Sequence, residues 1–147
     1  MNWIIYLLSA AAGAANPAQA AANAELRKTL NQILAATMFV YLSGLIGILL
    51  IQLISRQPFP PLQKLASVPW WAWTGGLLSI AATMAGADFA QRLGSGVFTG
   101  ISVTAALIMS LVLDNYGWMG FKLHPASWPR LLGCALMIAG LWMVSEF

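Results

Sequence analysis

Residues 30–54 read LNQILAATMFVYLSGLIGILLIQLI, and none of them is Asp, Glu, Lys, Arg or His. A hydrocarbon layer of about 30 Å is crossed by roughly 20 helical residues, because each residue adds about 1.5 Å. A helix also satisfies its own backbone hydrogen bonds, which lipid cannot do. The segment is therefore predicted to be a transmembrane helix.

Four further segments meet the same test. The five predicted spans run from about Asn2 to Asn23, Leu30 to Ile54, Pro69 to Ala87, Gly94 to Leu113 and Pro129 to Ser145. Pro69 and Pro129 suit the first turn of a helix, and the Gln57–Pro61 stretch cannot continue the preceding helix. We expect an all-α integral membrane protein, with residues 1–147 forming one domain of five transmembrane helices.

The composition of the whole chain agrees with this interpretation. Of the 147 residues, 60% are hydrophobic and 7% are charged, against roughly 45–50% and 25% in soluble domains. Most of the exterior must therefore face the lipid bilayer, which excludes a soluble enzyme and a disordered tail. No basic run is dense enough for nucleic acid. The one cysteine, Cys134, cannot form an internal disulfide.

The first span resembles a secretory signal at one point only. Ala18-Gln19-Ala20 is similar to a signal-peptidase site, but no Lys or Arg occurs before Arg27. Because secretory signals begin with a positive region, we expect a retained helix.

Positive charges in the loops give almost no preference for one orientation. With five spans, one face carries three cations, Arg27, Lys28 and Arg92, and the other carries four, Arg56, Lys64, Lys122 and Arg130. Topology follows such counts. The near balance suggests that the chain inserts both ways and pairs with an inverted copy of itself, and it leaves open which side the termini face.

The first span carries a polar face. Asn16, Gln19 and Asn23 follow one another at spacings of three and four residues, and so share one side of a helix. Pro17 lies among them, and its ring frees the carbonyl of Gly13, which predicts a kink or interruption. Two interpretations stay open: the amides line a substrate cavity, or they hold helices together.

Other residues inside the spans are assigned by the same reasoning. Tyr41 and Thr83 are candidates to line the cavity, although a tyrosine can also bond a neighbouring backbone carbonyl. Small residues that let helices approach closely are predicted to pack them together: Gly75, Ser79, Gly96, Gly100, Gly133 and Gly140. Trp70 and Trp71 are predicted to anchor or gate at the membrane interface.

No Asp, Glu, Lys, Arg or His lies near the centre of a span, which argues against proton antiport through an embedded carboxylate. Asp88 and Arg92 are expected to form an exposed ion pair, and Asp114 to be a solvated loop residue. His124 has no second ligand at metal spacing. We find no catalytic constellation, cofactor motif or metal site, and expect no enzyme.

Several motifs in order resemble the YdcZ-like five-helix inner-membrane proteins of bacteria, within the drug/metabolite transporter superfamily. They are Asn23-Ala24, Leu26 and Arg27, Pro69-Trp70-Trp71, Gly75-Gly76, Leu93-Gly94, Ser110 with Asp114 and Gly117, and Leu132-Gly133 with Gly140. The family often has a Gly-Gln pair in its fourth helix, where this chain has Ala105 and Ala106. No substrate contact is therefore carried over from that helix.

The resemblance implies a half-sized relative of ten-helix exporters whose two halves are inverted repeats. An inverted homodimer, or a pair with a sibling five-helix chain, would rebuild ten helices around a cavity. The expected function is a bacterial inner-membrane transporter, of exporter type, moving a small organic metabolite or drug-like solute by alternating access. The alternatives are a non-transporting subunit that docks a larger complex and a small-ion channel.

Overall fold

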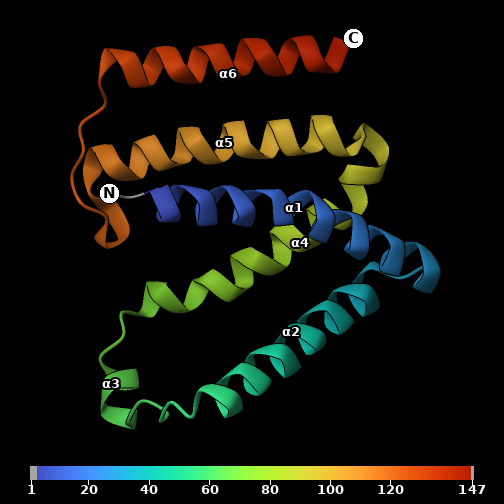
Figure 1. Ribbon diagram of the computed structural model, residues 1–147, viewed down its shortest axis with the longest axis vertical. Helices are drawn as coiled ribbons and strands as arrows, with labels where there is room; N and C mark the ends of the chain where they lie inside the picture. Colours follow the sequence, from blue (N-terminus) through green and yellow to red (C-terminus); the bar gives the residue numbers. More distant parts are fainter. Residues whose placement is uncertain (1–2, 147) are drawn as a thin grey trace. The chain divides into compact units, whose positions relative to one another are not determined.

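The computed structural model describes residues 3–146, and within that range every regular element is a helix (Figure 1). The elements are α1 (Trp3–Leu30), α2 (Ile33–Ser55), α3 (Leu62–Ala66), a 3-10 turn (Trp70–Trp73), α4 (Thr74–Leu93), α5 (Ser95–Tyr116), a second 3-10 turn (Trp118–Gly120) and α6 (Trp128–Glu146). The predicted all-α class is confirmed. The start of the first predicted span, Asn2, lies outside the described residues.

Five of these helices are long and overlap the five predicted segments, but their ends differ from prediction. α1 continues seven residues beyond Asn23, and it passes through Pro17 without interruption. The third predicted span starts later, because Pro69 is extended (φ −57°, ψ 141°) and precedes a 3-10 turn rather than an α-helix. α2 ends at Ser55, before the Gln57–Pro61 stretch, as predicted.

The described residues divide into two compact units. Unit 1 contains residues 3–18 and 89–146, and unit 2 contains residues 19–88. The boundaries fall inside helices, after Ala18 in α1 and after Asp88 in α4. The first of these boundaries lies one residue beyond Pro17.

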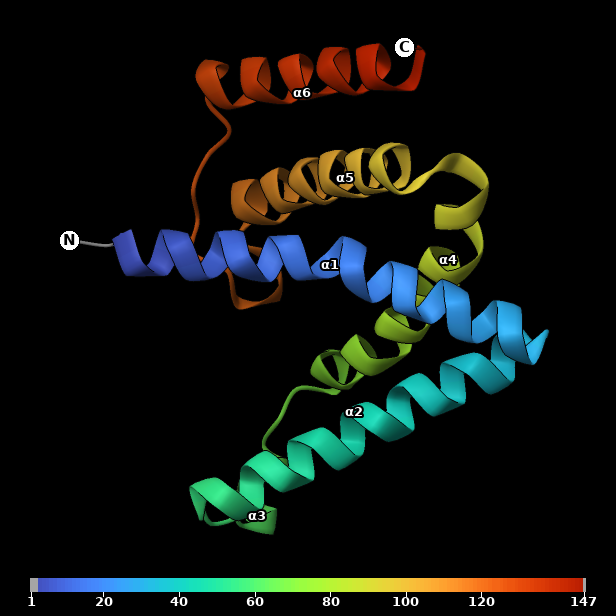
Figure 2. The same ribbon diagram turned by 45° about the vertical axis from the view of Figure 1, so that its right-hand side comes forward.

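Unit 2 is built around the antiparallel pair α2 and α4, which lie side by side in both views (Figures 1 and 2). A tight turn joins α1 to α2, with Asn31 at a positive φ of 52° that asparagine tolerates better than most residues. Small residues are buried in each of the three long helices of this unit, among them Ala24 of α1, Ala36 of α2 and Ala87 of α4. Small side chains let helix backbones approach closely where lipid gives no hydrophobic drive to pack.

Unit 1 contains the neighbouring helices α5 and α6 (Figure 1). The two helices contact each other closely at Gly100, where an added Cβ atom would lie 2.5 Å from Cδ1 of Leu141. Gly117 ends α5 in the left-handed region (φ 62°), which glycine adopts without strain, and its N–H donates to the carbonyl of Leu113.

The distribution of side chains is the reverse of that in a soluble protein. Among the described residues the buried positions hold glycine, alanine, asparagine, threonine and cysteine, whereas most Leu, Ile and Trp side chains are exposed. Three helices, α2, α5 and α6, are long and apolar enough to cross a membrane. An apolar exterior of this extent indicates a membrane protein.

Candidate solute-binding site

Polar side chains from three helices of unit 2 meet at one hollow of about 360 Å³. This polar hollow is lined by Gln19 of α1, by Val40, Tyr41, Gly44, Leu45 and Ile48 of α2, and by Ser79 and Thr83 of α4. Its volume is near the lower end of the roughly 300–1,000 Å³ of small-molecule sites. A mostly apolar wall with a few convergent polar groups is typical of such sites.

The Tyr41 hydroxyl joins the two main walls of the polar hollow. It donates to Oγ of Ser79 at 2.7 Å and lies 3.2 Å from Oγ1 of Thr83. Ser79 and Thr83 are four residues apart, so they lie one above the other on the same face of α4. The alternative partner for Tyr41, a backbone carbonyl, is not the one found.

The three amides of the predicted polar face occupy different surroundings. Gln19 is exposed and lines the polar hollow. Asn23 is buried, with 8% of its surface exposed, and is not among the lining residues. Asn16 is exposed and belongs to unit 1.

A second hollow, of about 390 Å³, lies along α5 and α6 in unit 1 and is largely apolar. It contains Gly96, Gly100 and Gly140, three of the residues predicted to pack helices. Gly100 contacts Leu141 closely, whereas Gly75, Gly96, Gly133 and Gly140 have no described atom within 4 Å of an added Cβ. Its polar lining is limited to the hydroxyls of Thr99 and Thr104, so the polar hollow is the better candidate site.

An ion pair joins α1 to α4 inside unit 2. Nη2 of Arg27 lies 2.5 Å from Oδ1 of Asp88, and the two side chains are 32% and 17% exposed. The sequence predicts an exposed ion pair between Asp88 and Arg92, but it does not predict the contact between Asp88 and Arg27. One feature of the sequence is compatible with this contact. The loops after the first and third spans, which carry Arg27 and Asp88, are predicted to lie on the same membrane face.

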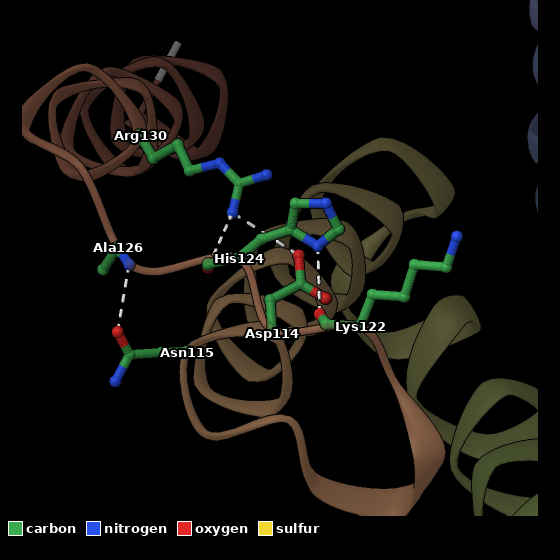
Figure 3. A network of polar contacts seen from close by, with 6 residues as sticks. All are labelled: Asp114, Asn115, Lys122, His124, Ala126 and Arg130. Carbon is green, nitrogen blue, oxygen red and sulfur yellow. Dashed lines mark hydrogen bonds and ion pairs between the residues drawn. The ribbon is translucent and has the colours of Figure 1, made fainter.

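A second polar cluster closes the loop between α5 and α6 (Figure 3). Nη1 of Arg130 lies 3.5 Å from Oδ2 of Asp114 and donates to the carbonyl of His124 at 3.3 Å. The His124 N–H donates to the carbonyl of Asp114 at 2.8 Å, and the Ala126 N–H donates to Oδ1 of Asn115 at 3.0 Å. Asp114 is thus paired rather than simply solvated, and Arg130 offsets the unfavourable placement of an anion at a helix C-terminus.

The remaining predicted residues lie outside the polar hollow. Trp70 is exposed and Trp71 is half-buried, both in the 3-10 turn before α4. Within residues 3–146 no group of three or more His, Cys, Asp or Glu side chains is arranged to hold a metal ion.

The comparison with protein families covers almost the whole chain. Residues 4–143 match the model of a family described as "Putative inner membrane exporter, YdcZ". The chain belongs to this family. No curated protein and no solved structure matched the chain. The resemblance inferred from the motifs is confirmed, and it makes the protein a membrane protein of an inner-membrane exporter family.

Sequence reasoning gave Ser79 a packing role and missed its hydrogen bond with Tyr41. The four-residue spacing of Ser79 and Thr83 was visible, but nothing in the sequence identifies which residue of another helix faces them. Tyr41 and Ser79 become partners because α2 and α4 lie side by side, which is a feature of the fold and not of either segment.

The Arg27–Asp88 pair is expected to contribute to the stability of unit 2. In a double-mutant cycle with Arg27→Gln and Asp88→Asn, we expect a coupling free energy of about 1 kcal/mol, because both side chains are partly shielded. The measurement is thermal unfolding of the purified protein in detergent.

The matched control is Glu25→Gln. Glu25 lies 3.9 Å from Lys28 and both side chains are about two-thirds exposed, so this change should leave the unfolding temperature unaltered. Strictly additive effects of the Arg27 and Asp88 substitutions would contradict the assignment.

Proposed function

We propose that this protein is a transporter that moves a small organic solute across the bacterial inner membrane by alternating access. The observation that carries the proposal is the convergence of Gln19, Tyr41, Ser79 and Thr83 on one hollow in a chain whose large side chains are mostly apolar and exposed. Membership of an inner-membrane exporter family supports it. Export is the direction that the family description favours.

We propose that all five long helices cross the membrane. α1 and α4 are less apolar than α2, α5 and α6, which are the helices within residues 3–146 that pass the length and apolarity test. These two helices are also the ones that supply Gln19, Ser79 and Thr83 to the polar hollow. Polar residues in a spanning helix normally face a cavity or another helix, so a lower mean apolarity is compatible with a span.

In this proposal Gln19, Tyr41 and Thr83 hydrogen-bond the solute. Asn16 and Asn23 share a helical face with Gln19 and are candidates for the same role. Pro17 weakens α1 beside the unit boundary at Ala18, where bending between inward-open and outward-open states would cost least. Trp70 and Trp71 anchor or gate at the interface.

We further propose that two copies assemble in opposite orientations. The nearly even division of loop cations, three against four, allows both insertions. An inverted pair has two related halves, the arrangement on which rocking-type alternating access depends. The alternative to this inverted homodimer is a pair in which the partner is a sibling five-helix chain.

Transport is tested in proteoliposomes with a panel of radiolabelled small organic solutes. For any solute transported, Tyr41→Phe should lower the rate by roughly five- to tenfold, because a hydrogen bond to the solute is worth about 1 kcal/mol. Tyr6→Phe is the matched control, since Tyr6 is exposed in α1 and far along the sequence from the hollow. Background rates across the panel, or equal loss in both variants, would refute the proposal.

The inverted pair is tested in a Cys134→Ala background by cross-linking two differently tagged copies in native membranes. One copy carries Thr29→Cys, at the end of α1, and the other carries Gln57→Cys, just after α2. Five spans place these positions on opposite faces of one chain, so an inverted pair brings them to the same face. We expect cross-links between positions 29 and 57. Links only between like positions, with labelling from a single side, would exclude the inverted pair.

A further inference from the structure

The hydroxyl groups of the polar hollow form a chain with a defined direction. Tyr41 donates its single proton to Ser79 at 2.7 Å, and a phenol has only one proton to give. In the 3.2 Å contact with Thr83 the donor must then be the threonine hydroxyl. The hydroxyl chain therefore runs from Thr83 to Tyr41 to Ser79.

At its Ser79 end, the hydroxyl chain has a hydroxyl group that donates to no described acceptor. Ser79 receives the Tyr41 hydrogen bond, and its own hydroxyl donates no hydrogen bond within the described part of the protein. Gln19, on the third wall, likewise makes no side-chain hydrogen bond among the described residues. A solute in the polar hollow thus finds one free hydroxyl donor, Ser79, and the carboxamide of Gln19, which can both donate and accept. The oxygens of Tyr41 and Thr83 remain available as acceptors.

Among residues 3–146 no charged side chain lines the polar hollow. The nearest charged residue along α4 is Asp88, five residues or roughly 7.5 Å beyond Thr83, and it is paired with Arg27. A charged solute would lose its hydration shell here without gaining a counterion. A charge at a helix centre in a membrane is costly, whereas a neutral carbonyl or hydroxyl oxygen loses little and accepts a hydrogen bond from the Ser79 hydroxyl.

We infer that the polar hollow selects uncharged solutes that carry an acceptor oxygen, such as a carboxamide, ketone or alcohol on a small apolar body. The acceptor oxygen accepts a hydrogen bond from the Ser79 hydroxyl, and Gln19 hydrogen-bonds the remaining polar group. Ser79 is thereby a specificity-determining residue rather than only a packing residue. This inference rests on the proposed transport function and names the class of solute.

The test uses three pyridines of similar size that differ in charge: nicotinamide, the nicotinate anion and the cation of 3-(aminomethyl)pyridine. The full-length protein in lipid nanodiscs carries 3-fluorotyrosine at its three tyrosines. Fluorine NMR resonances are assigned with Tyr6→Phe and Tyr116→Phe. The resonance of Tyr41 then reports directly on the hydroxyl chain.

Nicotinamide should shift the Tyr41 resonance saturably, with an apparent affinity at least about tenfold above those of the two charged pyridines. Ser79→Ala should weaken nicotinamide binding by roughly five- to tenfold, and Ser79→Thr, which keeps the hydroxyl, should restore it. Ser43→Ala is the matched control on α2, because the Ser43 hydroxyl bonds only the carbonyl of Val40. This control should bind like the unmodified protein.

Three results would overturn the inference. Equal or tighter binding of a charged pyridine would show that the solute class is wrong, while transport measured in proteoliposomes would still stand. Undiminished nicotinamide binding in Ser79→Ala would remove the role of Ser79. A Tyr41 resonance unmoved by all three pyridines would show that the hollow does not accept this class, whatever the transport assay reports.

Discussion

The hydrogen bond between Tyr41 and Ser79 is the contact on which the candidate site depends. It ties α2 to α4 across the polar hollow at 2.7 Å, and in a low-dielectric surrounding such a bond is stronger than in water. The same hydroxyl also contacts Thr83. One phenol thus connects two helices and, in the proposed site, leaves the Ser79 hydroxyl as the hydrogen-bond donor for a solute.

Lipid as the surrounding solvent explains why the rest of the fold is arranged around small residues. Apolar side chains gain little by leaving lipid, so helices associate through close backbone contact and polar bonds. Ala24, Ala36 and Ala87 are accordingly buried in unit 2, and Gly100 contacts Leu141 in unit 1. The Arg27–Asp88 pair adds a polar connection between α1 and α4 at the end of unit 2.

Sequence alone gave the helical class, the five long segments and the family, because apolar runs and ordered motifs are local features. It also identified Gln19, Tyr41 and Thr83, which line one hollow, since polar residues in apolar segments are few. It did not give the Ser79 bond, the Arg27–Asp88 pair or the Asp114–Arg130 contact. Each of these contacts joins two helices. The spacing of residues along one helix does not determine how that helix is rotated against another, so the partners could not be predicted.

The central claim is that water and solute reach the hydroxyl chain, rather than that these hydroxyls only hold helices together. It is tested most directly by the alkylation rate of introduced cysteines with iodoacetamide in native membranes, in a Cys134→Ala background. The reaction needs a thiolate, which forms where water reaches the thiol. The account predicts that Thr83→Cys reacts at least about tenfold faster than Leu77→Cys, a control on an exposed apolar position of α4. Equally slow reaction at both positions would contradict it.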